Sequence, residues 1–145
     1  MEIELQRLLD ENACEKLISK YCHLVDFGNA SAIADLFTSD GSWSGPDVSM
    51  IGQEEIRAGF KRREAVARRQ SRHLCTNVLI HVNGDEALGL CYLLNFRHDS
   101  STGIAALPAP SGLPKYVGEY HDLFIRTAEG WRFTTRRFDL AFLRD

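Results

Sequence analysis

The sequence lacks any long apolar run, basic leader or excess of positive charge. No stretch approaches the roughly 20 consecutive apolar residues that a membrane-spanning helix needs. Residues 1–12 are acidic and lack the basic start and apolar core of a signal peptide. Lysine and arginine number 17 against 20 aspartates and glutamates, and this net charge of -3 gives no general attraction to nucleic acid or anionic lipid. The sequence therefore predicts a cytoplasmic protein with neither a nucleic-acid nor a membrane partner.

The motifs that hold metals, phosphates or nucleophiles are also missing. There is no glycine-rich phosphate loop, no nucleophile elbow and no cluster with metal-ligand spacing. The cysteines include no CxxC pair, and each lies within an apolar segment, which favours small buried hydrophobic residues over a disulfide scaffold or a zinc site. They are Cys14, Cys22, Cys75 and Cys91. We therefore expect no cofactor and no bound metal.

The composition that remains is typical of a globular protein. Hydrophobic residues make up 44% and charged residues 26% of a 145-residue chain, which is an ordinary size for one domain. There is no internal repeat, low-complexity tract or linker. Residues 1–145 are therefore expected to form a single domain.

The first half of the chain predicts helices. Gly28 is a natural stop for a first helix, Ser31 can cap a short second one, and Asp40-Gly41 breaks the chain after it. Apolar residues at helical spacing mark the same segments. The expected helices are residues 12–27, 31–37 and about 53–69.

The second half predicts antiparallel strands over residues 73–82, 87–97, 117–126 and 131–143. Asn83-Gly84 is a strong hairpin signal between the first two strands, and residues 128–130 join the last two. Between the pairs, residues 99–116 contain three prolines and are expected to form an ordered flap or subunit contact beside a pocket. Helices first and antiparallel strands after them indicate an α+β fold.

Several short motifs, in their order and spacing, resemble the SnoaL-like branch of the nuclear-transport-factor-2-like superfamily. The resemblance covers nearly the whole chain. Its markers are Tyr21–Asp26, Leu36-Phe37 with Asp40-Gly41, Gly52 to Ile56, His73–Asn77, Gly118–Tyr120 and Gly130-Trp131.

The resemblance implies a conical roll, in which three N-terminal helices pack on a strongly curved, mainly antiparallel sheet that encloses an apolar pocket. Enzymes of the superfamily include scytalone dehydratase, bile-acid 7α-dehydratase, hexachlorocyclohexane dehydrochlorinase, steroid isomerases and polyketide cyclases. The implied function is a cofactor-independent lyase or isomerase acting on a hydrophobic, cyclic small molecule. The alternative is a non-catalytic small-molecule-binding or dimerisation module of the same fold. Members commonly pair through the sheet, so a homo-oligomer, either a dimer or a trimer, is expected.

Asp26 and His73 are the principal catalytic candidates that the resemblance implies. Asp26 ends the first helix, where the helix dipole disfavours a carboxylate by about 0.3–1 kcal/mol. His73 matches the base of the family's dehydratases, and Asp26 would orient it for proton abstraction. The alternatives are an exposed aspartate beside a turn and a structural histidine.

Tyr21 is the third catalytic candidate, as a group that polarises a substrate oxygen or protonates a leaving group; a structural buried tyrosine is the alternative. His98 is a candidate second pocket histidine, because scytalone dehydratase carries one at this spacing. Arg126 aligns with a pocket arginine of the dehydrochlorinase or forms an edge salt bridge. Both are expected to bind substrate.

Asn95, Trp43 and Tyr120 are expected to line the pocket. Asn95 stands where the bile-acid dehydratase carries a carboxylate, so the resemblance does not extend to bile-acid dehydration. A strict two-residue turn at Asn83-Gly84 would pair His73 with Leu94. Pairing His73 with Asn95 on the inner face requires a longer turn or a bulge.

The basic residues concentrate in residues 61–72, which include Lys61, Arg62, Arg63, Arg68 and Arg69. Such charges on an amphipathic helix are usually its solvated side. The alternative is recognition of an anionic substrate tail, such as a carboxylate or a coenzyme A phosphate.

Overall fold

A computed structural model describes all residues from 1 to 145. Two α-helices, one 3-10 helix and six strands follow one another along the chain. They are α1 (Glu2–Asp26), η1 (Ala30–Leu36), β1 (Phe37–Gly45), β2 (Val48–Ile51), α2 (Gln53–Glu64), β3 (Arg69–Asn83), β4 (Glu86–Asp99), β5 (Tyr116–Thr127) and β6 (Gly130–Leu143).

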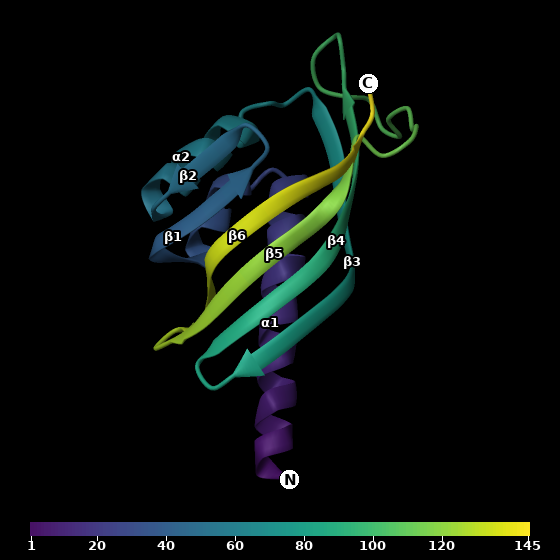
Figure 1. Ribbon diagram of the computed structural model, residues 1–145. Helices are drawn as coiled ribbons and strands as arrows, with labels where there is room; N and C mark the ends of the chain where they lie inside the picture. The colour runs from purple at the N-terminus through teal and green to yellow at the C-terminus, as the bar shows by residue number, and fades with distance from the viewer.

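The six strands form one sheet in the order β2-β1-β6-β5-β4-β3. Every neighbouring pair is antiparallel except β1 and β6, which run parallel. Figure 1 shows α1 running behind the curved sheet, with α2 and β2 at the upper left. The expected α+β cone, with three helices on a mainly antiparallel curved sheet, is confirmed.

Helix α1 is longer than the sequence predicts, because it begins at Glu2 instead of residue 12. Glu2 and Glu4 in its first turn interact favourably with the helix dipole, which helps to explain the early start. These first turns extend beyond the sheet in Figure 1 and leave Ile3 and Leu8 exposed. The C-terminal half is buried against the sheet. The helix ends at Asp26, and Gly28 follows two residues later with a φ of 85°.

The β1–β2 hairpin is not predicted from the sequence, and the observed third helix is shorter than the predicted one. β1 contains serine, glycine and aspartate, residues that are depleted in strands or favour turns, so its pattern predicts a break. Helix α2 ends at Glu64, and Arg69 already begins β3. The basic residues 61–72 are therefore divided between a helix and a strand.

A bulge in β3 sets the position of His73. The turn leaves Gly84-Asp85 unpaired, not Asn83-Gly84, because Asn83 pairs with Glu86. That register alone would place His73 opposite Phe96. Between Thr76 and Leu79 the register shifts by one residue, and His73 consequently pairs with Asn95. The bulge contains Asn77 in the left-handed conformation with a φ of 52°, which asparagine tolerates better than most residues.

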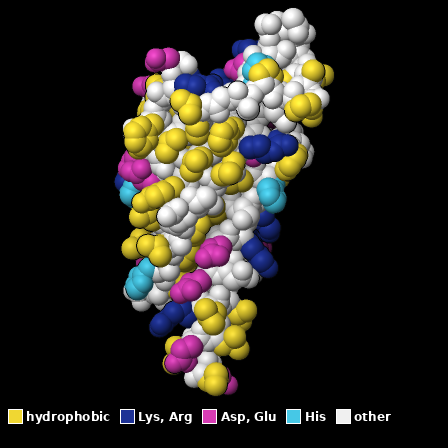
Figure 2. All heavy atoms as spheres, turned by 90° about the vertical axis from the view of Figure 1, so that its right-hand side faces the viewer, with side chains coloured by type: hydrophobic (Ala, Val, Ile, Leu, Met, Phe, Trp, Pro, Cys, Tyr) yellow, Lys and Arg dark blue, Asp and Glu magenta, His cyan; other side chains and the backbone are white.

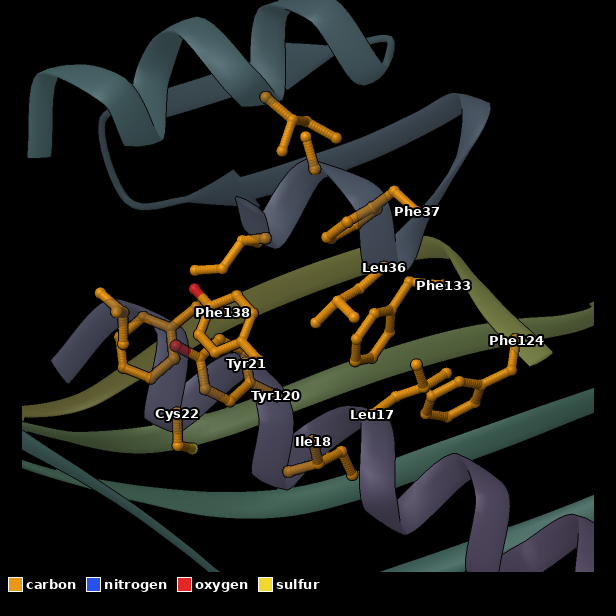
Figure 3. Packing of buried hydrophobic residues seen from close by; sticks show 14 of the residues in the cluster. Leu17, Ile18, Tyr21, Cys22, Leu36, Phe37, Tyr120, Phe124, Phe133 and Phe138 are labelled. Carbon is orange, nitrogen blue, oxygen red and sulfur yellow. The ribbon is translucent and has the colours of Figure 1, made fainter. Parts of the chain in front are cut away.

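The core lies between the sheet and the helices. Figure 3 shows Phe37, Leu36 and Phe133 packed together, while Tyr21, Tyr120 and Phe138 form a second aromatic group beside them. Three of the four cysteines are buried and the fourth is partly buried, and none forms a disulfide. No helix in the structure combines the length and the apolar character needed to cross a membrane.

The opposite face of the sheet exposes large apolar side chains. Leu79 on β3, Leu88 on β4 and Leu123 on β5 are 72%, 56% and 43% exposed. Figure 2, turned to the β3–β4 side, shows hydrophobic side chains gathered over the upper part of the molecule and again at the tip of α1. The homo-oligomer expected to pair through the sheet stays a prediction.

Candidate active site

Asp26 and His73 meet where the end of α1 crosses β3. The Asp26 Oδ1 atom lies 2.7 Å from His73 Nδ1, and Oδ2 accepts a hydrogen bond of 2.8 Å from the backbone N–H of His73. The side chain of Asp26 is 4% exposed and that of His73 is 15% exposed. The carboxylate is therefore enclosed, and the imidazole separates it from solvent.

Ser71 and Arg63 extend this pair into a chain of hydrogen bonds. The Ser71 hydroxyl donates to Asp26 Oδ1 at 2.9 Å and accepts from Arg63 Nη2, also at 2.9 Å. Burial raises the pKa of the Asp26 carboxyl, but the hydrogen bonds and charge of His73, together with Ser71, outweigh it and lower the pKa below its ordinary value. Asp26 is therefore ionised near neutral pH.

The contact with Asp26 fixes the proton on the His73 ring. An ionised carboxylate only accepts hydrogen bonds. The Nδ1 atom therefore carries the ring proton and donates a hydrogen bond to Oδ1. In the neutral ring, Nε2 then keeps its lone pair. The amide nitrogen of Asn95 lies 3.4 Å from both ring nitrogens and packs against the imidazole. The Nε2 atom of His73 is thus the ring nitrogen that can accept a proton.

Tyr21 lies on α1 between the dyad and the β1–β2 hairpin. Its hydroxyl accepts a hydrogen bond of 3.0 Å from Trp43 Nε1, and its ring packs against Tyr120 with the centroids 5.8 Å apart. Burial raises the pKa of Tyr21 to about 12. The phenol therefore keeps its proton at neutral pH and can donate it to an oxygen in the pocket.

These side chains line a cavity of about 660 Å³. Its deep walls are mostly apolar or aromatic, and its more exposed rim includes Pro46, Asp47 and Arg62. His73, Tyr21, Asn95, Trp43 and Tyr120 line it, whereas Asp26 stands behind His73. The remaining apolar walls are formed by Val25, Met50, Phe60, Leu93, Phe138 and Leu140.

Two of the expected substrate-binding residues do not line this cavity. On β4, Asn95 and Arg97 point into the cavity, so the two-residue period of a strand turns His98 outward, where it borders residues 107–113. Arg126 lies at the far end of β5 and pairs with Asp10 at 2.8 Å and with Asp85 at 3.0 Å. The salt-bridge alternative for Arg126 is therefore the one observed.

Arg136, which the sequence motifs do not single out, is fully buried directly beneath the pocket. Its guanidinium carbon lies 3.5 Å from the ring centroid of Tyr120 and 4.3 Å from that of Tyr21. Its Nε lies 3.1 Å from Asp122 Oδ1, which is also fully buried. Burial is the largest single influence on the pKa of Arg136 and lowers it, but Asp122, together with Tyr120, Cys75 and Tyr21, outweighs burial and raises the pKa, so Arg136 remains a cation.

A bulge in β6 explains why the sequence pattern does not predict the buried position of Arg136. Trp131 and Phe133 face the core, so strict alternation along β6 predicts that Thr135 follows them inward and Arg136 points outward. The register of β6 against β5 shifts by one residue at Thr134, which reverses the facing beyond it. The one sequence signal for a buried arginine here is an acidic residue opposite it on the neighbouring strand, such as Asp122.

One group of side chains is close enough to hold a metal ion: Glu119, His121 and Asp139. They lie on β5 and β6, outside the cavity. Arg137 already pairs with both carboxylate oxygens of Asp139 at 3.1 Å, and His121 Nε2 lies 3.3 Å from the same carboxylate. The negative charge of Asp139 is thus already balanced, and we assign no metal to this group.

The profile of the SnoaL-like domain matches residues 6–137. The chain belongs to the SnoaL-like family. No curated protein matches it. Among solved structures, an NTF2-like protein with a cystatin-like fold from Novosphingobium aromaticivorans is 25% identical with a TM-score of 0.81, over 96% of this chain and 86% of that one.

Two further structures resemble this SnoaL-like protein in fold. A candidate scytalone dehydratase from Novosphingobium aromaticivorans is 20% identical, with a TM-score of 0.80 over 96% of this chain and 89% of that one. A protein of unknown function from Mycobacterium tuberculosis is 24% identical, with a TM-score of 0.77 over 95% of this chain and 75% of that one. The family that the sequence motifs indicate is confirmed.

Proposed function

We propose that this SnoaL-like protein is a cofactor-independent lyase or isomerase of the dehydratase type, acting on a hydrophobic cyclic molecule. The observation that carries the proposal is the 2.7 Å contact between Asp26 and His73 at the wall of a largely apolar cavity. A carboxylate and an imidazole in this arrangement form a general base. The fold similarity to a candidate scytalone dehydratase agrees with this reaction class.

His73 removes the proton that starts the reaction. Its Nε2 lone pair takes a proton from a carbon beside an activating carbonyl, and the C–H electron pair becomes part of the enolate. Asp26 stabilises the resulting imidazolium through the Nδ1 hydrogen bond and the opposite charge. The apolar wall excludes water and thereby strengthens this charge pair.

Tyr21 supplies a proton to the departing oxygen in the dehydration form of the reaction. When the enolate collapses, a carbon–carbon double bond forms and the carbon–oxygen bond of the leaving hydroxyl breaks. The Tyr21 phenol, protonated at neutral pH, gives its proton to that hydroxyl, which leaves as water. The protonated His73 then returns a proton to the Tyr21 phenolate, directly or through that water, and both groups regain their starting states.

The proposal is tested with the purified protein and a panel of cyclic β-hydroxyketones, with loss of water followed by mass spectrometry. Proton abstraction alone is followed as exchange of the carbon-bound proton for deuterium in heavy water. General-base catalysis contributes about 10²–10⁴-fold, so His73→Ala should lose activity on that scale while remaining folded.

His81→Ala is the matched control, because His81 is exposed on the same strand and lies outside the cavity. It should leave both reactions unchanged. If His73→Ala dehydrates and exchanges as fast as the wild type, the dyad is not the base. A panel that binds in the pocket but neither reacts nor exchanges would favour the non-catalytic binding module instead.

A further inference from the structure

The cavity that holds the dyad has an excess of positive charge. Five cationic side chains line it, on α2, β3, β4 and the residue before β5, and the only aspartate or glutamate in its lining is Asp47. The five are Arg62, Arg63, Arg69, Arg97 and Lys115. This excess contrasts with the net charge of -3 of the whole chain. Positive charge is thus concentrated at this pocket.

Only part of this charge is neutralised within the protein. Asp99 pairs with Arg69 at 2.8 Å and with Arg97 at 3.0 Å, so one carboxylate serves two lining guanidinium groups. Arg68, outside the cavity, lies 3.8 Å from the same carboxylate. Arg62, Arg63 and Lys115 form no ion pair. Three of the five lining cations therefore have no carboxylate partner within ion-pair distance.

Among the three unpaired cations, Arg63 is the one that a chain of hydrogen bonds joins to the dyad. Its Nη2 donates to the neutral Ser71 hydroxyl, which in turn donates to Asp26. Burial, followed by the like charges of Arg69 and Arg97, lowers the pKa of Arg63. An anion beside Arg63 would offset the repulsion among these guanidinium groups.

We propose that the pocket binds a carboxylate-bearing hydrophobic molecule, with its carboxylate on Arg63 and its apolar body against Phe60, Leu93 and Phe138. One Arg63 nitrogen is used by Ser71, and the other N–H donors are free for a planar two-oxygen acceptor. The inference rests on the proposed function, because it names the class of substrate for the same pocket. The carboxylate places the body of the substrate beside the His73 base.

The test compares 2-naphthoate with its neutral isostere 2-naphthamide by isothermal titration calorimetry. Hydrogen bonds to charged groups are among the strong ones, so the wild-type protein should bind 2-naphthoate about tenfold more tightly than 2-naphthamide. Added sodium chloride should weaken 2-naphthoate binding and leave 2-naphthamide unchanged, because salt screens the partly exposed charges. This wild-type comparison requires no variant to fold.

Arg63→Gln should abolish the preference for the carboxylate while retaining 2-naphthamide binding. Lys61→Gln is the matched control, since Lys61 lies on the same helix, is 74% exposed and does not line the cavity. It removes the same charge and should retain the preference. Equal wild-type affinity for the two ligands, no binding of either, or equal losses in both variants would overturn the proposal.

His73→Ala separates this inference from the proposed function. It should keep the preference for 2-naphthoate over 2-naphthamide, even though it no longer dehydrates or exchanges a substrate. If the wild-type protein prefers the carboxylate but neither dehydrates nor exchanges any substrate, the result counts against the proposed reaction alone. Turnover of neutral cyclic hydroxyketones with no carboxylate preference would count against the anionic substrate alone.

Discussion

Asp26 holds His73 at two points, with one carboxylate oxygen on the ring Nδ1–H and the other on the backbone N–H of the same residue. The backbone contact fixes β3 against the end of α1, and the ring contact fixes the imidazole. Position and tautomer are thus set by a single side chain. This explains why a carboxylate is retained at a helix end, where the dipole disfavours it.

Asp26→Asn is consequently expected to be a severe change despite its similar shape. An amide offers one acceptor and one donor, so one of the two His73 N–H groups faces an N–H donor. Activity should fall by about 10²–10⁴-fold, and unfolding should become easier by about 1.5–3 kcal/mol. Turnover assays and urea denaturation measure the two effects. Ser71→Ala, which removes only the third hydrogen bond, should cost less in both; an equal cost would contradict this account.

Acid should destabilise the protein through carboxylates with lowered pKa values, among them Asp10, Asp26 and Asp99. The pKa of Asp26 lies below its ordinary value, and hydrogen bonds from Arg126 lower the pKa of Asp10 to about 2. The unfolded chain therefore binds more protons than the folded one between about pH 2 and pH 4, so stability rises with pH in this window. The contribution is complete above about pH 4 and is lost as pH falls through the folded-state pKa values.

Urea denaturation between about pH 5 and pH 2 should show this decline in the free energy of unfolding. Asp10→Asn should flatten the slope over the window, whatever it does to stability at neutral pH, because one of the linked carboxylates is gone. An unchanged slope in Asp10→Asn would show that Asp10 is not one of the linked carboxylates.

The dyad could be predicted from the sequence because its residues belong to motifs with fixed order and spacing. Asp26 ends a helix with a clear stop signal, and His73 opens a β-rich segment. Trp43 was placed at the pocket by resemblance, although the strand that carries it was missed. Its turn-prone neighbours concealed a hairpin that pairing with β6 helps to stabilise. Such long-range pairing leaves little trace in local composition.

Strand register decides much of the site. A single extra residue in β3 brings His73 opposite Asn95, as the expected place of Asn95 in the pocket requires, and another in β6 turns Arg136 into the core. Neither bulge can be predicted from the two-residue alternation of inward and outward side chains along a strand. His98 was misplaced for the opposite reason, because β4 keeps strict alternation from Asn95 onward and turns His98 away. Alignment to a family motif did not override that geometry.

The β3 bulge can be tested at Asn77, whose side chain is exposed and makes no packing contribution to lose. Asn77→Val should destabilise the protein by about 1–2 kcal/mol, because a β-branched residue is strained at a φ of 52°. Activity should fall as well, since a shifted register moves His73 away from Asn95. Asn77→Gly, which accepts this conformation, should stay close to wild type in urea denaturation. Equal stability of the two variants would argue against the bulge.

The buried ion pair beneath the pocket gives the last prediction. Asp122 and Arg136 are both 0% exposed, and Arg136 also supports the Tyr21 and Tyr120 rings that line the cavity. Removing one partner leaves an uncompensated buried charge, so Asp122→Leu and Arg136→Met should each cost about 3–5 kcal/mol of stability. Removing both leaves no charge behind, and the double variant should lose less than the sum of the two single losses, by about 1–3 kcal/mol.

Chemical denaturation of the four proteins in this cycle measures that coupling directly. The exposed pair of Arg137 and Asp139 on the same strand is the matched comparison, because its side chains are 53% and 44% exposed. Alanine at either position there should cost less than about 1 kcal/mol, since solvent screens the charges. Additive losses at Asp122 and Arg136 would mean that packing around each side chain, and not their mutual attraction, stabilises the residues beneath the pocket.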